Sequence, residues 1–171
     1  MKKIVLNLLL TVLLASCNTV GNRESEKDRT LVIPGQSCEG FALGKKTGIS
    51  GFTSIVDPTK KDTPLSGILS RHLPRLNFNR IAYMRNRYVL FLHDETVKAV
   101  AGLSSINRIT DEAVRLSEGA DIFIMNYGNS GLEIIRDDRH RIYLYRKLGI
   151  ALFDDYGDDT IDMYLVFTPE E

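Results

Sequence analysis

Cysteine and histidine are scarce in this sequence of 171 residues, and their scarcity excludes several kinds of chemistry. There are two cysteines, Cys17 and Cys38, and three histidines that stand apart from one another, His72, His93 and His140. Two isolated cysteines form no disulfide framework and no CxxC pair. The histidines lack the spacing of a metal-binding pair on a helix. We expect Cys38 to be a small buried residue, and the alternatives are a reactive thiol or an intermolecular bridge.

Motifs of the common enzyme classes are also absent. The sequence has no Gly-x-Ser-x-Gly elbow, no Ser-x-x-Lys and no Gly-x-Gly-x-x-Gly followed by an acidic residue. The Gly-Lys-Lys-Thr stretch at 44–47 is similar to the end of a phosphate-binding loop, but it lacks the upstream glycine and strand. These absences predict a protein that is not an enzyme and that needs no cofactor.

Charge is balanced overall but unevenly distributed along the chain. Basic and acidic residues number 22 each, and 43% of the residues are hydrophobic, which is ordinary for a globular domain. Between Lys45 and Arg87 nine basic residues stand against two acidic ones, whereas the chain from Asp154 onward has seven acids and no base. A basic stretch attracts acidic partners or membrane phosphates. Arg80, Arg85 and Arg87 are therefore candidate partner-binding residues, and the alternative is a solvated surface.

The first residues have the order of a secretion signal. Met-Lys-Lys precedes an apolar run from Ile4 to Leu14, which is too short to span a bilayer comfortably. The run leads into Leu14-Ala15-Ser16-Cys17, which resembles the lipobox of bacterial lipoproteins; the alternative is an ordinary secretory signal. The resemblance implies that residues 1–16 are a signal peptide and that Cys17 becomes the acylated first residue.

The residues after Cys17 predict where the protein lies. Asn18 follows the cysteine, which by resemblance to the usual bacterial sorting pattern favours the outer membrane. Residues 18–30 are polar and charged with one apolar residue, Val20, so they cannot bury enough surface to fold. We expect residues 17–30 to form a lipidated cysteine and a flexible tether that hold the domain at the membrane.

The rest of the chain contains an internal repeat. Residues 37–54 align without a gap on the stretch Thr110–Gly128, so that Glu39 falls on Glu112. The similarity continues downstream, where 80–83 matches 141–144, 88–91 matches 150–153, and 96–97 matches 160–161. A period of this length indicates a duplicated structural unit. The sequence therefore predicts two modules, at 31–104 and 105–171.

Each module is expected to combine a helix with antiparallel strands, because apolar runs alternate with short polar turns. The expected strands are 80–84, 88–93, 96–101, 132–136, 141–146, 150–154 and 160–167. In the second module we expect a helix with Ser117 as N-cap and Gly128 at the C′ position. In the first we expect a short helix after Thr47 and another over Gly67–Leu73. The prediction is an α+β fold of two tandem repeats, each a helix or short helical hairpin packed on antiparallel strands.

This pattern resembles a known family of small modules. The residues that carry the resemblance are Leu116, Ser117, Asp121, Ile122, Tyr127 and Gly128, followed by the strand-like stretch 148–153. They look like the modules of the BamE/SmpA outer-membrane lipoproteins and of the tandem-module β-lactamase inhibitor protein. The resemblance implies that an exposed sheet face, or the loops beside it, binds other proteins.

Two groups of residues in the second module are candidate sites. Asp154, Asp155, Asp158 and Asp159 surround a glycine in a tight turn, an arrangement that hard cations such as calcium favour; the alternative is a solvated hairpin loop. Tyr143 and Tyr145 share one face of a strand. They are candidate partner-binding residues, since tyrosine suits protein recognition, and the alternative is cross-strand packing.

Together these observations predict a non-enzymatic lipoprotein of the cell envelope, anchored in membrane lipid through acylated Cys17, that acts as a protein-binding or scaffold module. Its partner would be an envelope protein, and the expected location argues against nucleic acid. The first alternative is an inhibitor of an extracellular or periplasmic hydrolase, with the 154–159 turn as its inserting loop. The second is a small-ligand-binding protein or an enzyme.

Overall fold

The computed structural model describes residues 31–48, 50, 52, 54–57, 69, 71–84, 88–104, 108–137 and 140–170. Within these residues the chain is mostly β. The strands are β1 (Leu31–Val32), β2 (Ser37–Cys38), β3 (Phe41–Ala42), β4 (Ser54–Val56), β5 (Arg80–Met84), β6 (Tyr88–His93), β7 (Thr96–Leu103), β8 (Ile109–Thr110), β9 (Leu132–Asp137), β10 (His140–Tyr145), β11 (Ile150–Asp154) and β12 (Met163–Phe167). A 3-10 turn, η1 (Leu116–Glu118), leads into the helix α4 (Ala120–Tyr127). The predicted signal peptide, Cys17 and the tether lie outside the described residues.

One eight-stranded sheet organises the fold, in the order β4-β5-β6-β7-β12-β11-β10-β9. All neighbouring strands in it are antiparallel. The sheet consists of two four-stranded meanders, and the last strand of one pairs with the last strand of the other. In this central pair of strands, β7 and β12, Val100 lies opposite Val166. The short connections that the sequence indicated therefore produce antiparallel neighbours, as predicted.

The inner strands are buried on both faces, which explains their nearly continuous apolar sequence. Alternate residues point to opposite faces, so Leu90 and Leu92 enter one core cluster while Phe91 enters the other. In β11, Leu152 belongs to the first cluster and Phe153 to the second. Each cluster draws residues from both meanders, so one folded body results rather than two separate cores.

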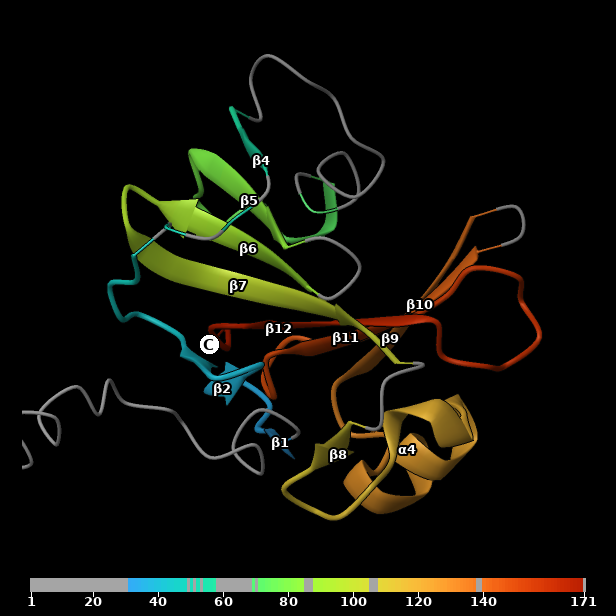
Figure 1. Cartoon of the computed structure of the whole chain (residues 1–171). Coiled ribbons are helices and arrows are strands. Elements are labelled where there is room, and N and C mark those ends of the chain that lie inside the picture. The colour runs from blue at the N-terminus through green and yellow to red at the C-terminus, as the bar shows by residue number, and fades with distance from the viewer. Residues whose placement is uncertain are drawn as a thin grey trace, which may run out of the picture.

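One face of the sheet is covered by the N-terminal arm (residues 31–48) and by α4. Figure 1 shows β1, β2, β8 and α4 on the same side of the central strands β7 and β12. Val32 and Cys38 from the arm and Phe123 from α4 pack into the same apolar cluster as the sheet. The other face is covered in part by the segment before β5, where Leu69 and Leu73 are buried.

The helix α4 starts later than the sequence predicted. Gly119, with φ of 109°, is the N-cap, and Ser117 lies in the preceding 3-10 turn and makes no capping hydrogen bond. The prediction that Ser117 caps the helix was therefore wrong, because Ser117 lies within a turn of 3-10 helix that precedes α4. The predicted end was correct: Gly128 follows the last helical residue, and its N–H donates to the Ile124 carbonyl.

The described residues show no tandem repeat of a helix packed on a sheet. The prediction that each module has a matching helix is therefore wrong for these residues. The arm residues that align with η1 and the start of α4, residues 43–48, follow strand β3 as a turn and an isolated bridge between Lys46 and Thr96, and they are not helical. Of the helix expected after Thr47, the described residues 48, 50 and 52 are not helical, and β4 follows at 54–56. Of the helix expected over Gly67–Leu73, the described residues 69, 71 and 72 are helical. What the structure repeats is the four-stranded meander.

The arm crosses the predicted module boundary. β1 pairs in parallel with β8, which joins Leu31 to Ile109 and Val32 to Thr110. The Gly35 N–H donates to the Gly149 carbonyl at 3.2 Å. The first residues of the proposed first module thus lie against the second. Among the described residues no helix is long and apolar enough to cross a membrane.

Candidate functional site

The acidic turn after β11 is held rigid by its own first residue. The Asp154 side chain is fully buried. Its Oδ1 accepts the backbone N–H groups of Tyr156, Gly157 and Asp158, and its Oδ2 accepts that of Asp159 at 3.0 Å. A carboxylate with four backbone donors fixes the conformation of the turn that follows it. Asp154 is therefore the organising residue of the turn.

The other three aspartates of the turn point to different partners. Asp155 faces His140, with 3.6 Å between Oδ1 and Nδ1. Asp158 accepts the Thr160 N–H, and Asp159 accepts the Tyr143 hydroxyl at 3.0 Å and a guanidinium N–H of Arg141. Among the described residues no group of three or more His, Cys, Asp or Glu side chains is placed to hold a metal ion. The geometry favours a hairpin turn over the calcium site considered from the sequence.

The turn displays one large side chain to solvent. Tyr156, at its tip, is 76% exposed. Beside the turn lies a hollow of about 470 Å³. The hollow is lined by the start of the helix and by the turn: Ser117, Glu118, Gly119, Ala120, Asp121, Ile124, Tyr143, Asp158, Asp159 and Thr160. This corner of the molecule therefore combines an exposed aromatic ring with several carboxylates.

Tyr143 and Tyr145 share a face, as predicted, but that face is covered. Their relative exposures are 5% and 2%, and both belong to the cluster that packs against α4. The Tyr145 hydroxyl donates to the Gly128 carbonyl at 2.9 Å. Burial raises the pKa of both phenols. Their position supports cross-strand packing rather than partner binding on an open sheet face.

The candidate cations of the basic stretch are described only in part. Arg80 begins β5 and is exposed. Arg85 and Arg87 lie outside the described residues. The sequence placed these three together by proximity in the chain, and the structure locates one of them on the surface.

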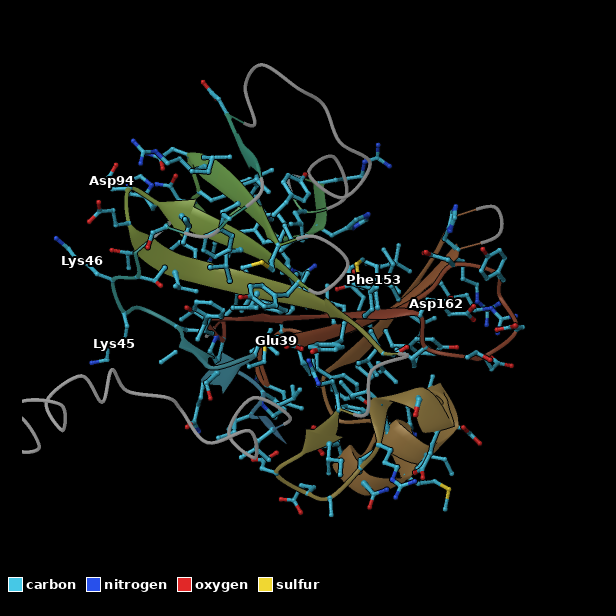
Figure 2. All side chains as sticks on the ribbon, viewed as in Figure 1. Glu39, Lys45, Lys46, Asp94, Phe153 and Asp162 are labelled. Carbon is cyan, nitrogen blue, oxygen red and sulfur yellow. The ribbon has the colours of Figure 1, made fainter. Side chains whose placement is uncertain are left out.

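A buried polar cluster lies where the arm meets the centre of the sheet, and no sequence pattern predicted it. Glu39, in the turn between β2 and β3, accepts two guanidinium N–H groups of Arg108 and the hydroxyl of Tyr164. Figure 2 shows Glu39 just below the central strands. The Glu39 and Arg108 side chains are 4% and 9% exposed, and Tyr164 is fully buried. The paired residues are 69 positions apart, too far for any local motif to reveal.

Burial also affects two titratable groups at this place, Tyr164 and Cys38. It raises the pKa of the Tyr164 phenol, and the nearby Glu39 charge raises it further. Cys38, 1% exposed, has a thiol pKa raised well above its ordinary value by burial and then by Glu39. A thiol of this kind is protonated and inert, so the expectation of a small buried cysteine is confirmed.

Comparison with protein-family models, with curated proteins and with solved structures gives no match. The resemblance to the BamE/SmpA modules therefore stays a prediction.

Proposed function

We propose that this protein is a lipid-anchored, non-enzymatic protein-binding module of the bacterial cell envelope. The lipobox Leu14-Ala15-Ser16-Cys17 and the polar stretch 18–30 support the anchor and the tether, with the outer membrane favoured by Asn18. The rigid turn that presents Tyr156 supports partner binding. We further propose that the two meanders derive from one duplicated unit, as the aligned stretches of β5–β6 and β10–β11 suggest.

The observation that carries protein binding is the pre-organisation of the 155–159 turn. Four backbone N–H groups are already bonded to Asp154, so the turn loses little conformational entropy when a partner binds. Tyrosine supplies a large contact area at interfaces. The exposed acids Asp155, Asp158 and Asp159 attract a partner with a basic surface. The expected partner is therefore an envelope protein with a basic, concave contact surface.

Site-specific photocrosslinking of the full chain in intact cells tests this proposal. A photoreactive phenylalanine analogue replaces Tyr156 in one strain and Met125 in a second, because Met125 is 79% exposed on α4 and gives a matched control. We expect a discrete crosslinked envelope protein from position 156 and not from 125. Equal, diffuse crosslinking from both positions would show that the turn is not an interface.

Anchoring is tested independently through Cys17. In cells given a radiolabelled fatty acid, the wild-type chain should carry the label and fractionate with membranes. Cys17→Ser removes the acylation site and should abolish the label, with release of any processed chain from the membrane fraction. Labelling that survives Cys17→Ser would contradict the lipoprotein assignment without bearing on the turn.

A second candidate function, inhibition of an extracellular or periplasmic hydrolase, is favoured by the same turn. A rigid loop with an exposed aromatic tip fits the cleft of an enzyme better than a mobile one. The test adds the purified full chain to wall-degrading and other envelope hydrolases. Inhibition that Tyr156→Ala weakens and Met125→Ala does not would support this candidate, and unchanged hydrolase rates would exclude it for the enzymes assayed.

A further inference from the structure

A second hollow, of about 420 Å³, lies at one end of the β7–β12 pair, between the segment before β5 and the C-terminal tail. Phe167 ends β12, and Lys98 lies on the neighbouring strand β7. The residues that line the hollow are Arg75, Leu76, Asn77, Lys98, Phe167, Thr168, Pro169 and Glu170. None of them belongs to the acidic turn or to the buried polar cluster, so this is a separate feature of the surface.

The two cations of the hollow make no ion pair with the residues that the structure describes. Among the described residues, no carboxylate pairs with Arg75 or Lys98, and neither side chain makes a hydrogen bond within that part of the chain. The single acid in the lining, Glu170, is already paired with Arg146, with 3.2 Å between Oε2 and Nη1. The hollow therefore has an excess of positive charge, which favours an anion.

The walls are held in place before any ligand arrives. Arg146 donates to the His72 carbonyl at 2.6 Å on one side and to Glu170 on the other. The Glu170 N–H in turn donates to the Arg146 carbonyl at 3.0 Å. One side chain thus fixes the spacing between the segment at 72–77 and the tail. A ligand would meet a preformed site, which reduces the cost of binding.

The hollow also offers apolar surface beside its charges. Phe167 is 1% exposed and anchors the wall in the second core cluster, and Leu76 is half-buried against the same cluster. Pro169 adds exposed apolar surface on the tail side. Polar groups at one part of a concave site and apolar groups at another fix the orientation of an amphipathic ligand. The amide of Asn77 and the hydroxyl of Thr168 supply further hydrogen-bond donors.

We propose that this hollow binds an anionic head group, a carboxylate or a phosphate, whose short apolar chain lies against Leu76 and Pro169. Arg75 and Lys98 hold the head group by charge-assisted hydrogen bonds. The proposal depends on the hollow alone and not on partner binding by the acidic turn. The ligand is either a free small molecule or the head group of a lipid in the membrane that carries the protein.

Titration of the full chain in nonionic detergent with hexanoate and with hexyl phosphate tests the free-ligand source. Calorimetry measures the affinity, and amide chemical shifts of residues 75–77, 168 and 170 report the place of binding. We expect saturable binding that falls with added salt, since exposed charges are screened. Lys98→Gln should weaken it about fivefold, a modest effect because a partly exposed ion pair is screened by water.

Matched controls separate the hollow from general surface charge. Lys45→Gln removes an exposed cation elsewhere, and Figure 2 shows the Lys45 side chain extending away from the body of the molecule. It should leave the affinity unchanged. Glu170→Gln removes the acid of the hollow and should strengthen binding, the opposite direction from Arg75→Gln. A merely structural role for these residues would not give effects of opposite sign.

Reconstitution of the full chain into vesicles tests the lipid source. Hydrogen exchange is compared between phosphatidylcholine vesicles and vesicles that also contain phosphatidylglycerol. Slower exchange at residues 75–77, 168 and 170 only with the anionic lipid, lost in Lys98→Gln, would assign the site to a lipid head group. Saturable, Lys98-dependent binding of the soluble probes would assign it to a small molecule. Absence of both, or binding that ignores Arg75 and Lys98, would overturn the proposal.

Discussion

Glu39 is the residue whose environment departs furthest from what the sequence indicates. Its φ is 55°, a left-handed conformation that non-glycine residues adopt at a cost. Its carboxylate is buried, and burial of a charge is tolerated only with close partners. Arg108 and Tyr164 are those partners, and they join the arm to the start of β8 and to the central strand β12. The cluster therefore fastens three distant segments of chain at one point.

Removal of Glu39 should destabilise the whole fold. Glu39→Ala leaves the Arg108 charge buried and unpaired, which should lower the free energy of unfolding by about 3 kcal/mol. Glu112→Ala is the control, because Glu112 aligns with Glu39 in the repeat but is exposed, and its loss should cost under about 0.5 kcal/mol. Urea unfolding followed by circular dichroism measures both. Equal effects of the two substitutions would show that the buried pair contributes little.

Cys38 should make the stability of the fold fall at alkaline pH. The pKa of its thiol is raised in the folded state by burial. Its contribution to stability is therefore fully present below the pKa that the thiol has in the unfolded chain, and it is lost as the pH rises above that value. Above about pH 8.5 the Cys38 thiol ionises in the unfolded chain but not in the folded one. The free energy of unfolding then falls by up to about 1.4 kcal/mol per pH unit. Urea unfolding at pH 7 and pH 10 should show a larger loss for the wild type than for Cys38→Ala. Parallel losses in the two proteins would contradict this.

At the scale of elements, the 155–159 turn depends on a single side chain. Asp154→Ala leaves four backbone N–H groups without their acceptor. Water replaces part of these bonds, so the free energy of unfolding should fall by about 2–3 kcal/mol. Amide exchange at 156–159 should become faster. Asp158→Ala, which removes the acceptor of one exposed N–H, is the control and should change stability little. Unchanged exchange in Asp154→Ala would mean that the turn is held by other contacts.

The β10–β11 hairpin depends on Gly149 for both backbone conformation and space. Gly149 has φ of 76°, and a Cβ there would meet the Phe167 carbonyl and Gly35. Gly131 has φ of 75° with open space around it, so Gly131→Ala should cost only the conformational penalty of about 1 kcal/mol. Gly149→Ala should lower the free energy of unfolding by at least about 2 kcal/mol more than Gly131→Ala, because the arm must move away from the new Cβ. Thermal unfolding compares the two, and equal shifts would argue against close packing of the arm.

The elements differ in how far the sequence predicted them, for physical reasons. β5, β6 and β11 begin and end where expected, because apolar residues and turn signals are local. The start of α4 was misplaced, since a serine signals a cap but does not exclude a 3-10 turn before the helix. The role of Asp154 was missed, because an aspartate that bonds the following amides has the same sequence signature as a calcium ligand. The partners of Glu39 could not be predicted from the sequence, because only tertiary packing brings them together.

At the scale of the whole molecule, the repeat in the sequence does not produce two independent bodies. The central strand pair β7–β12 joins the meanders, and both core clusters extend across it. The arm adds a second connection, since β1 pairs with β8 and Glu39 bonds to Arg108 and Tyr164. Each meander shares these contacts with the other and therefore cannot bury its surfaces alone.

The second module expressed alone, residues 105–171, should therefore fail to fold. Without β7 the edge of β12 is unpaired, and without the arm the cluster around Phe123 is uncovered. Amide proton shifts should show little dispersion in the fragment and full dispersion in the intact chain. The control is the intact chain with a protease site inserted after residue 104. After cleavage the two pieces should stay folded, because the β7–β12 pair and the arm hold them together. A well-dispersed spectrum from the fragment would instead mean that each meander folds by itself, and that the arm merely rests on a finished domain.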